Sequence, residues 1–440
     1  MTASEYDAQN NEIKAVDGLS YFDEKIYNQR DELQTRKTKN QALIEYAYDN
    51  VGRLIKETNG DEIVEYVYDN NDNLVKTIVN GQIQTVREYD ALNRTIAKKE
   101  YRDGKIFTFT YEYDIVESLE SGQYKEKTTD PYNDIVEKVY DKVGRQIQVT
   151  NKGNTTIYTY YANGALEKTV YPNGMVEQYT YYPDNTLKEL VNKKADNTEI
   201  SKYTYEYDNN NNVTKKIDKL GETSYSYNAL DMLLEVNKKQ DGKKMVYTYD
   251  GAGNRTKETL TTIEGDKIVQ YVYNQKNQLV KKIEEDNSVT VYTYDNNGNE
   301  VQVEKNGEMI TQNIYNAKNE LVKTIENGIE TTYKYDVLGN RIEKTNGGHT
   351  IKYFYEGNQV VLELNENNEQ VAKNVYGINL ISRSTPEQLG YYIYNGHGDV
   401  ERVLNQNNEE IAKYYYDEFG QIKEETSTFD NPYRYARILL

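Results

Sequence analysis

Short runs of alternating apolar and polar residues fill the chain from one end to the other. In the run VEYVYD at 64–69, Val64, Tyr66 and Tyr68 fall on one side of an extended strand and the intervening residues on the other. β-Branched and aromatic residues dominate these runs, as they do in strands. No long segment has the 3.6-residue period of an amphipathic helix. The pattern predicts many short β-strands.

Turn-forming residues separate the strands and define a repeating unit. Asp69-Asn70-Asn71-Asp72-Asn73 follows the first strand of one unit, a second strand is predicted at Leu74–Val79, and Asn80-Gly81 follows that strand. Asn, Asp and Gly tolerate positive φ, and Asn-Gly between alternating runs is a strong hairpin signal. Each unit is therefore predicted to consist of a strand, a turn, a second strand and a second turn. Equivalent second strands are predicted at Leu279–Ile283 and Leu321–Ile325, and equivalent Asn-Gly turns at 59–60, 306–307 and 327–328.

A tyrosine at the end of the first strand marks each unit and recurs about every twenty residues. The intervals lengthen between residues 90 and 140, where longer loops are expected, and no linker interrupts the series. The sequence therefore predicts one array of antiparallel hairpins. The marker tyrosines are Tyr6, Tyr27, Tyr48, Tyr68, Tyr89, Tyr113, Tyr140, Tyr160, Tyr182, Tyr207, Tyr227, Tyr249, Tyr273, Tyr294, Tyr315, Tyr335, Tyr355, a weaker copy at Tyr376, Tyr394 and Tyr416.

An array of this length predicts a sheet that coils or closes on itself. Strand twist accumulates, and open sheets rarely exceed about ten strands. The 440 residues contain only 5 prolines, which suits a long sheet because proline cannot donate to the ladder. The predicted fold is all-β: an array of antiparallel hairpins coiled into a spiral or barrel-like hollow shell.

Composition narrows the classes of partner. The chain has 46 Tyr, 6 Phe and no Trp, so tyrosine must supply most large core side chains. The net charge of -19 disfavours nucleic acid and anionic membranes as partners. The absence of cysteine excludes disulfides and thiolate metal sites. No apolar run predicts membrane insertion, and the N-terminal residues lack the pattern of a signal peptide.

The sequence of the unit resembles the YD repeat of bacterial RHS proteins, wall-associated protein A-like proteins and animal teneurins. The matching segments are Tyr48–Leu54, Tyr89–Arg94, Tyr249–Arg255 and Tyr335–Arg341. Residues 391–436 resemble the start of the RHS core region. The interpretation is a YD-repeat array at 1–390 and the start of a core-like region at 391–440.

The resemblance implies a hollow shell that, in toxin-bearing relatives, encloses a C-terminal effector domain. In those relatives the core region continues into a segment whose aspartates release the effector. Here the chain ends as Arg437-Ile438-Leu439-Leu440, so those aspartates have no counterpart and autoproteolysis is not carried over. Since the marker pattern already begins at Tyr6, a truncated or split member, or a fragment, is expected.

Two groups of residues are candidates for chemistry. The D-x-N-x-N motifs beginning at Asp69, Asp208 and Asp295 resemble the start of a calcium loop but lack its later glycine and glutamate, so turns are predicted. His349 and His397 both lie in Gly-rich segments, and His397 with Asp399 is a possible acid–base pair that the resemblance assigns to a structural turn. No residue is assigned as catalytic, cofactor-binding or metal-binding, and no cofactor is expected.

The sequence predicts a non-enzymatic shell or scaffold. Its expected partner is a toxin or effector polypeptide, or a neighbouring segment of a longer RHS protein. The resemblance implies secretion or cell-wall association, while the lack of a signal peptide leaves a cytoplasmic location open. The first alternative is an adhesion or carbohydrate-binding protein that contacts cell-surface glycans through tyrosines. The second is a hydrolase built from carboxylates, for which the sequence singles out no pair.

Overall fold

A computed structural model describes residues 2–435, which form forty β-strands and no α-helix. The strands belong to one sheet, and strands adjacent in sequence pair antiparallel, as β7 does with β8 and β8 with β9. The prediction of an all-β array of antiparallel hairpins is confirmed. Among the described residues no helix is long and apolar enough to cross a membrane.

The first twenty strands are β1 (Ala3–Tyr6), β2 (Glu12–Val16), β3 (Phe22–Tyr27), β4 (Leu33–Lys37), β5 (Leu43–Tyr48), β6 (Leu54–Asn59), β7 (Glu62–Tyr68), β8 (Leu74–Val79), β9 (Gln82–Tyr89), β10 (Thr95–Arg102), β11 (Lys105–Ile115), β12 (Tyr124–Thr129), β13 (Ile135–Tyr140), β14 (Gln146–Asn151), β15 (Asn154–Tyr160), β16 (Leu166–Val170), β17 (Val176–Tyr181), β18 (Leu187–Lys193), β19 (Glu199–Tyr207) and β20 (Val213–Asp218). The others are β21 (Gly221–Tyr227), β22 (Leu233–Lys238), β23 (Lys243–Tyr249), β24 (Arg255–Thr262), β25 (Gly265–Tyr273), β26 (Leu279–Ile283), β27 (Val289–Tyr294), β28 (Glu300–Lys305), β29 (Glu308–Tyr315), β30 (Leu321–Glu326), β31 (Ile329–Tyr335), β32 (Arg341–Asn346), β33 (His349–Glu356), β34 (Gln359–Leu364), β35 (Gln370–Tyr376), β36 (Leu380–Ser384), β37 (Leu389–Tyr394), β38 (Val400–Leu404), β39 (Glu410–Tyr416) and β40 (Ile422–Ser427).

In most units the marker tyrosine fastens its hairpin to the preceding one. The Tyr68 hydroxyl donates to the Leu54 carbonyl at 3.0 Å, 14 residues earlier in the chain. Beside this contact, Tyr68 pairs with Leu74 and Val67 with Lys76, so Val75 is the extra residue of a β-bulge. A bond from a marker hydroxyl to an earlier backbone carbonyl is also made by Tyr27, Tyr48, Tyr89, Tyr160, Tyr181, Tyr207, Tyr227, Tyr273, Tyr294, Tyr335, Tyr394 and Tyr416.

We expect Tyr68→Phe to weaken this part of the array by about 1 kcal/mol, because the Leu54 carbonyl loses its hydroxyl donor while the ring stays. Tyr66→Phe is the matched control: Tyr66 lies two residues earlier on the same face, and its hydroxyl has no hydrogen-bond partner among residues 2–435. Amide hydrogen exchange across β6–β8 measures the difference. Equal exchange rates in the two variants would contradict the fastening role.

The residue after the marker organises the turn. Asp69 Oδ1 accepts hydrogen bonds from the amides of Asn71 and Asn73 at 2.8 and 2.9 Å, and Oδ2 accepts from Asn73 Nδ2 at 2.9 Å. Asp72 has a φ of 66°, which Asp tolerates better than most residues. The Asn73 side chain and the two turn amides favour the charged carboxylate and lower the pKa of Asp69.

Most element boundaries agree with the sequence prediction, and the differences have local causes. The second strands Leu74–Val79 and Leu279–Ile283 are confirmed, and the strand predicted at Leu321–Ile325 extends to Glu326. The strand β17 ends at Tyr181, so the marker position there is Tyr181 and not Tyr182. Asn59 pairs with Glu62, which moves the predicted Asn59-Gly60 turn to Gly60 and Asp61, where only Gly60 has positive φ.

The strands group into two compact units. Unit 1 runs up to Tyr111 and adds 248–258 and 268–351, whereas unit 2 consists of 112–247, 259–267 and the chain from Lys352 onward. Each unit therefore combines an early and a late part of the array. The division predicted at residue 390, between the repeat array and the core-like region, stays a prediction.

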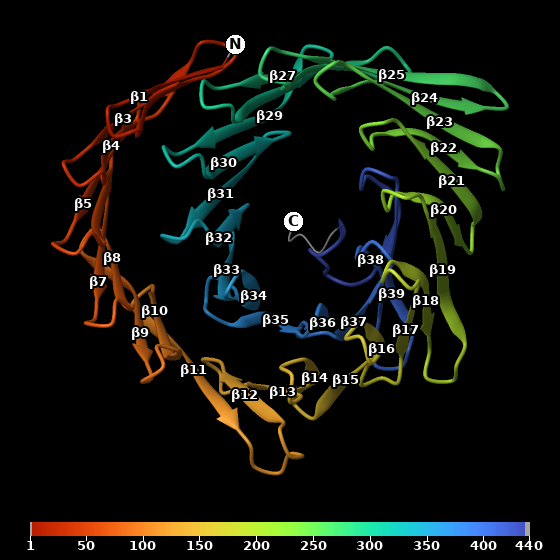
Figure 1. Ribbon diagram of the computed structural model, residues 1–440, viewed down its shortest axis with the longest axis horizontal. Helices are drawn as coiled ribbons and strands as arrows, with labels where there is room; N and C mark the ends of the chain where they lie inside the picture. Colours follow the sequence, from red (N-terminus) through yellow and green to blue (C-terminus); the bar gives the residue numbers. More distant parts are fainter. Residues whose placement is uncertain (1, 436–440) are drawn as a thin grey trace. The chain divides into compact units, whose positions relative to one another are not determined.

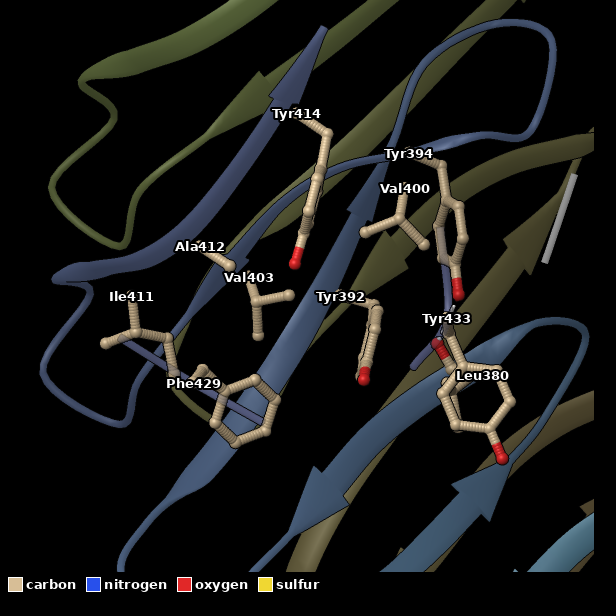
Figure 2. Close-up of a cluster of buried hydrophobic side chains, with 10 residues drawn as sticks. All are labelled: Leu380, Tyr392, Tyr394, Val400, Val403, Ile411, Ala412, Tyr414, Phe429 and Tyr433. Carbon is tan, nitrogen blue, oxygen red and sulfur yellow. Dashed lines mark hydrogen bonds between the residues drawn. The ribbon is translucent and has the colours of Figure 1, made fainter. Parts of the chain in front are cut away.

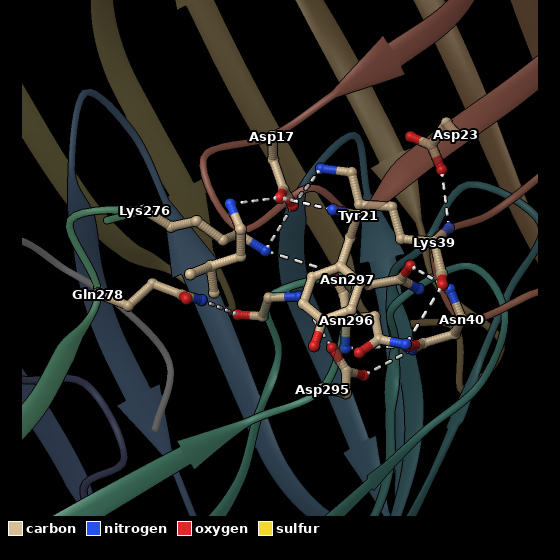
Figure 3. A network of polar contacts seen from close by, with 12 residues as sticks. Asp17, Tyr21, Asp23, Lys39, Asn40, Lys276, Gln278, Asp295, Asn296 and Asn297 are labelled. Carbon is tan, nitrogen blue, oxygen red and sulfur yellow. Dashed lines mark hydrogen bonds and ion pairs between the residues drawn. The ribbon is translucent and has the colours of Figure 1, made fainter. Parts of the chain in front are cut away.

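Within unit 1, the late strands β26–β32 lie alongside the early strands β1–β10 (Figure 1). Asp17, in the turn after β2, is central to one contact between them (Figure 3). Its carboxylate forms ion pairs with Lys39 at 3.0 Å and with Lys276 at 2.9 Å, and its side chain is 11% exposed. Asn40 donates to Asp295 at 2.8 Å in the same network. Ion pairs and a hydrogen bond thus connect residues that are more than 200 positions apart in the sequence.

We expect the Asp17 contact to weaken in acid. Burial alone would raise the pKa of Asp17, but Lys276 and Lys39 outweigh it and hold the pKa at about 2, below the ordinary 3.8. Since the folded-state pKa is the lower one, the stabilisation is complete above pH 3.8 and is lost as the pH falls toward 2. Its size is about 1–2 kcal/mol.

The measurement compares the urea midpoint of unit 1 unfolding in the parent chain and in Asp17→Asn at several pH values. The variant should be less stable at neutral pH, and the difference should vanish near pH 2. Asp61→Asn is the control, because Asp61 is exposed and has no ion pair among the described residues. A stability difference that stays constant with pH would contradict the prediction.

The strands of unit 2 from β34 to β39 are buried far more completely than the strands of unit 1. Leu362, Leu364, Tyr392 and Val403 are fully inaccessible to solvent. Figure 2 shows Tyr392, Tyr394 and Tyr414 pointing the same way as Val400 and Val403, with Phe429 and Tyr433 against them. The segment 428–435 after the last strand therefore completes this core, and continuous burial replaces the alternating pattern of the earlier repeats.

Candidate functional site

The two histidines occupy different settings. His349 is exposed at the start of β33, in unit 1. His397 lies in unit 2, in the turn after β37, where its Nδ1 is 3.0 Å from Asp399 Oδ1 and its ring stacks on Tyr435. The two side chains are therefore in contact. Asn395 Oδ1 also accepts the backbone amides of His397 and Asp399, so the same residues build a turn of the repeat type.

The D-x-N-x-N motifs are turns, as predicted. At Asp208 and Asp295, as at Asp69, Oδ1 accepts backbone amides of the turn and Oδ2 accepts a side-chain amide four residues on. Among residues 2–435, no group of three or more His, Cys, Asp or Glu side chains is arranged to hold a metal ion. The carboxylate oxygens of these motifs serve the turns themselves.

A buried ionic cluster lies beneath the C-terminal segment. The Arg383 side chain is 2% exposed and contacts Glu363 through both terminal nitrogens. Its Nε donates to the Asp430 carbonyl at 3.0 Å, and one terminal nitrogen donates to Asn374 Oδ1 at 3.2 Å. Burial disfavours the charged guanidinium, but Glu363 outweighs burial and raises the pKa of Arg383. The cluster ties segment 428–435 to β34–β36.

Buried polar bonds also join early and late strands within unit 2. Ser201 Oγ donates to Glu401 at 2.6 Å, and Asn192 Nδ2 donates to the Tyr394 carbonyl at 3.0 Å. Lys373 and Asp130 form an ion pair at 2.7 Å with side chains 4% and 1% exposed. These contacts fix one group of strands against the other and leave a space beside them.

That space is a cavity of about 380 Å³ in unit 2, here called the tyrosine cavity. Its walls come from β19–β22 and from β38–β40 with the turn that holds His397. Eight tyrosines dominate the lining: Tyr203, Tyr205, Tyr225, Tyr227, Tyr414, Tyr415, Tyr416 and Tyr435. Its volume falls within the range of small-ligand pockets, which are mostly apolar with a few placed polar groups.

Burial and nearby charge raise the pKa of three tyrosines of the cavity wall, Tyr203, Tyr205 and Tyr227. Burial, reinforced by Glu401, raises the pKa of Tyr203, and burial raises that of Tyr205. Burial, followed by Asp208 and Glu418, raises the pKa of Tyr227 to about 12. These phenols therefore act as hydrogen-bonding and stacking groups and supply neither base nor nucleophile near neutral pH.

Sequence reasoning identified His397 and Asp399 but neither the Arg383 cluster nor the tyrosine cavity. Arg383 follows Ile381 and Ser382 in a short strand, and its alternating neighbours resemble those of many solvated charges in the chain. The sequence around Arg383 is dense in apolar residues, and this density was the available signal of a buried ion pair. A charge among fully buried strands needs a partner.

Two solved structures match nearly the whole length of this chain at low sequence identity. The structure titled TcdB2-TccC3 matches with a TM-score of 0.79 and 16% identity, over 99% of this chain and 26% of that one. The Photorhabdus luminescens Tc holotoxin pore matches with a TM-score of 0.71 and 16% identity, over 99% of this chain and 25% of that one. At this identity the likeness shows a shared fold.

Curated relatives are larger proteins named as nucleases. The tRNA3(Ser)-specific nuclease WapA of Bacillus spizizenii is 29% identical over 68% of this chain, and the tRNA nuclease WapA of Bacillus subtilis is 28% identical over 68%. The matched region spans 13% of each relative's length.

The family model described as the teneurin YD-shell matches residues 181–436, more than half of the chain. The matched range contains the tyrosine cavity, the Arg383 cluster and marker tyrosines with their carbonyl contacts. The resemblance noted in the sequence is therefore confirmed by family, relatives and fold together, and the chain belongs to the teneurin YD-shell family.

Proposed function

We propose that this chain is a non-catalytic YD-shell wall that holds a toxin or effector polypeptide, or a neighbouring segment of a longer RHS-type protein. One observation carries the proposal: the polar groups that define the repeat are occupied by the wall. Marker hydroxyls donate to backbone carbonyls, as Tyr68 does to Leu54, and turn aspartates accept backbone amides, as Asp69 does. Repetition is thereby explained by structure without any recurring reactive site.

The relatives support the proposal that containment and catalysis belong to different parts of such proteins. They carry nuclease names, yet the region they share with this chain is 13% of their length. We assign the nuclease chemistry of such proteins to other parts of the polypeptide and containment to the YD repeats. One similar structure is titled a Tc holotoxin pore, and another is titled TcdB2-TccC3 without its hypervariable C-terminal region, which fits a cargo that varies while the wall stays constant.

A glycan-binding role has less support. Adhesion by stacking needs exposed tyrosine faces, whereas the marker tyrosines are mostly half-buried and their hydroxyls are engaged, as at Tyr48 and Tyr294. For a protein that holds effectors we propose an exported or wall-associated location, in line with the RHS resemblance.

The containment test fuses an unstructured reporter peptide after Leu440 through a site for a sequence-specific protease. After cleavage of that site, a contained reporter should remain bound through gel filtration and should resist a broad-specificity protease. The same reporter fused before residue 1, and the free reporter, are the controls. A C-terminal reporter digested as fast as the free peptide would overturn the proposal.

Catalysis is tested separately by incubating the purified chain with bulk tRNA. No cleavage above buffer is expected. Cleavage that persists after repurification and is abolished by His397→Ala would assign chemistry to the wall itself and overturn its non-catalytic role.

A further inference from the structure

Three Asn-Gly turns of unit 1 share one backbone conformation. Asn80, Asn306 and Asn327 have φ values of 48°, 52° and 49°, and the glycines that follow them have φ values of 77°, 83° and 81°. All three asparagines and their glycines are exposed to solvent. A Cβ built on any of these glycines would meet nothing within 4 Å, so water has similar access to the three turns. They differ in what holds the asparagine side chain.

In two of the turns a backbone amide of the adjacent strand holds that side chain. Asn80 Oδ1 accepts a hydrogen bond from the Ile63 amide at 2.8 Å. Asn306 Oδ1 accepts one from the Val289 amide, also at 2.8 Å. Each of these bonds keeps the side-chain amide directed at the neighbouring strand and away from the glycine that follows it.

The Asn327 side chain lacks such a bond. Its backbone amide donates to the Ile310 carbonyl at 3.0 Å, so the turn between β30 and β31 contacts β29 as the other turns contact their neighbours. Ile310, however, is the extra residue of a β-bulge, because Met309 and Thr311 pair with adjacent residues of β28. A bulged residue is turned out of the regular ladder. Within residues 2–435 the Asn327 side chain accordingly has no hydrogen-bond partner.

The other Asn-Gly pairs of the described chain are also constrained. Asn59 lies inside β6, where its backbone pairs with Ile44 on one side and Glu62 on the other. At the remaining pairs the asparagine side chain forms a hydrogen bond: these are Asn163, Asn173, Asn297, Asn346 and Asn395.

We propose that Asn327 is a modification site, at which spontaneous deamidation through a cyclic imide runs faster than at the matched turns of Asn80 and Asn306. The Gly328 nitrogen bonds to Asn327 Cγ, the Cγ–Nδ2 bond breaks, and Nδ2 leaves as ammonia with the proton of the Gly328 amide. Water then opens the imide at one of its two carbonyls and leaves aspartate or isoaspartate. Glycine has no Cβ to hinder this close approach.

The hydrogen bond of the matched turns sets the difference in rate. The side chain must turn toward its own backbone before it reacts, and at Asn80 and Asn306 this movement first breaks the bond to the adjacent strand. From the usual net contribution of one hydrogen bond, Asn327 should react roughly two- to tenfold faster than either.

The modification also loosens one hairpin. Asn327 and Gly328 form the loop between Glu326 and Ile329, which pair with each other. Isoaspartate carries the backbone through its β-carbon and so lengthens this two-residue loop, whose geometry fixes the register of the hairpin. Glu326 and Ile329 then lose their pairing. This consequence is independent of whether the chain contains an effector.

The test follows the three sites in the intact chain. The purified chain is incubated at mildly alkaline pH below its unfolding temperature, and peptide mapping by mass spectrometry gives the deamidated fraction at each asparagine over time. An unincubated sample, digested in parallel, corrects for deamidation during digestion. Asn327 should react fastest, and a rate at Asn80 or Asn306 that equals or exceeds the rate at Asn327 would overturn the proposal.

Concentrated urea provides the control for local sequence. In the unfolded chain the bonds from the Ile63 and Val289 amides are absent, so the three rates should converge. The same ratio of rates in urea as in the folded chain would assign the difference to the neighbouring residues and not to the fold, and would overturn the proposal.

Asn327→Gln tests the effect on the hairpin, because the longer glutamine side chain closes its imide far more slowly. Amide hydrogen exchange across β30–β31 is measured in fresh and aged samples of the parent chain and of the variant. Exchange should increase with age in the parent chain and stay constant in the variant. An equal increase in both, or no increase in a deamidated parent chain, would contradict the loosening of this hairpin by Asn327.

Discussion

Arg383→Met should lower the free energy of unfolding of unit 2 by about 3–5 kcal/mol, because it leaves the buried Glu363 carboxylate without its cation. Arg383 also holds the segment 428–435 through the Asp430 carbonyl and carboxylate, at 3.0 and 2.9 Å. The variant should therefore expose that segment to protease before the rest of the unit unfolds. Urea denaturation and mass-spectrometric mapping of cleavage sites measure the two effects.

A second substitution separates the loss of the pair from the loss of packing. In Arg383→Met/Glu363→Leu both charges are gone, and we expect most of the lost stability to return, since replacing a buried pair by apolar groups is often near neutral. Lys125→Met is the surface control: Lys125 pairs with Glu137 at 2.7 Å with side chains 21% and 34% exposed, and its loss should cost less than about 1 kcal/mol. A surface-sized effect of Arg383→Met would refute the buried-charge argument.

Tyr392→Ala should destabilise unit 2 by about 3–5 kcal/mol, the usual range for emptying a large buried aromatic site. Tyr392 is fully buried among Val400, Val403 and Phe429 (Figure 2). Its ring meets Tyr433 edge to face, with centroids 6.3 Å apart, and its hydroxyl donates to Asn431 at 2.7 Å. The same urea experiment gives the magnitude.

Tyr392→Phe divides this effect into its parts. It keeps the ring and removes only the hydroxyl bond to Asn431, so about 1–2 kcal/mol of loss is expected. Ile157→Ala is the control for large-to-small replacement outside the core, because Ile157 is 45% exposed, and it should change stability little. If Tyr392→Phe costs as much stability as Tyr392→Ala, the hydrogen bond to Asn431 and not the packing of the ring accounts for the loss.

Local structure was accessible from the sequence because its causes are local. The alternation around Tyr66 and Tyr68 determines which face of β7 is turned inward, and Asp69 closes its turn with amides two and four residues away. The prediction was wrong by one residue at two positions, the Asn59-Gly60 turn and the marker Tyr182. In both cases the observed position lies in the same hairpin. Such one-residue choices depend on neighbouring strands.

Contacts between distant repeats could not be read in the same way. Lys373 pairs with Asp130 across 243 residues, and Asp17 pairs with Lys276, yet both lysines resemble the many solvated lysines of the array. The target of the Tyr68 hydroxyl is a backbone carbonyl, which has no sequence signature at all. The sequence therefore does not indicate which repeat units contact one another, because every unit has similar side chains.

By itself, then, the sequence determined the strands, the turns, the marker tyrosines and the family, because period-two alternation and turn chemistry act within a few residues. The tertiary structure decided which groups lose contact with water: that Arg383 is buried on Glu363 and that tyrosines from early and late strands of unit 2 line one cavity. Burial and the meeting of distant charges depend on how strands far apart in the chain pack together, and that packing is set by the sum of many similar repeats and not by any one of them.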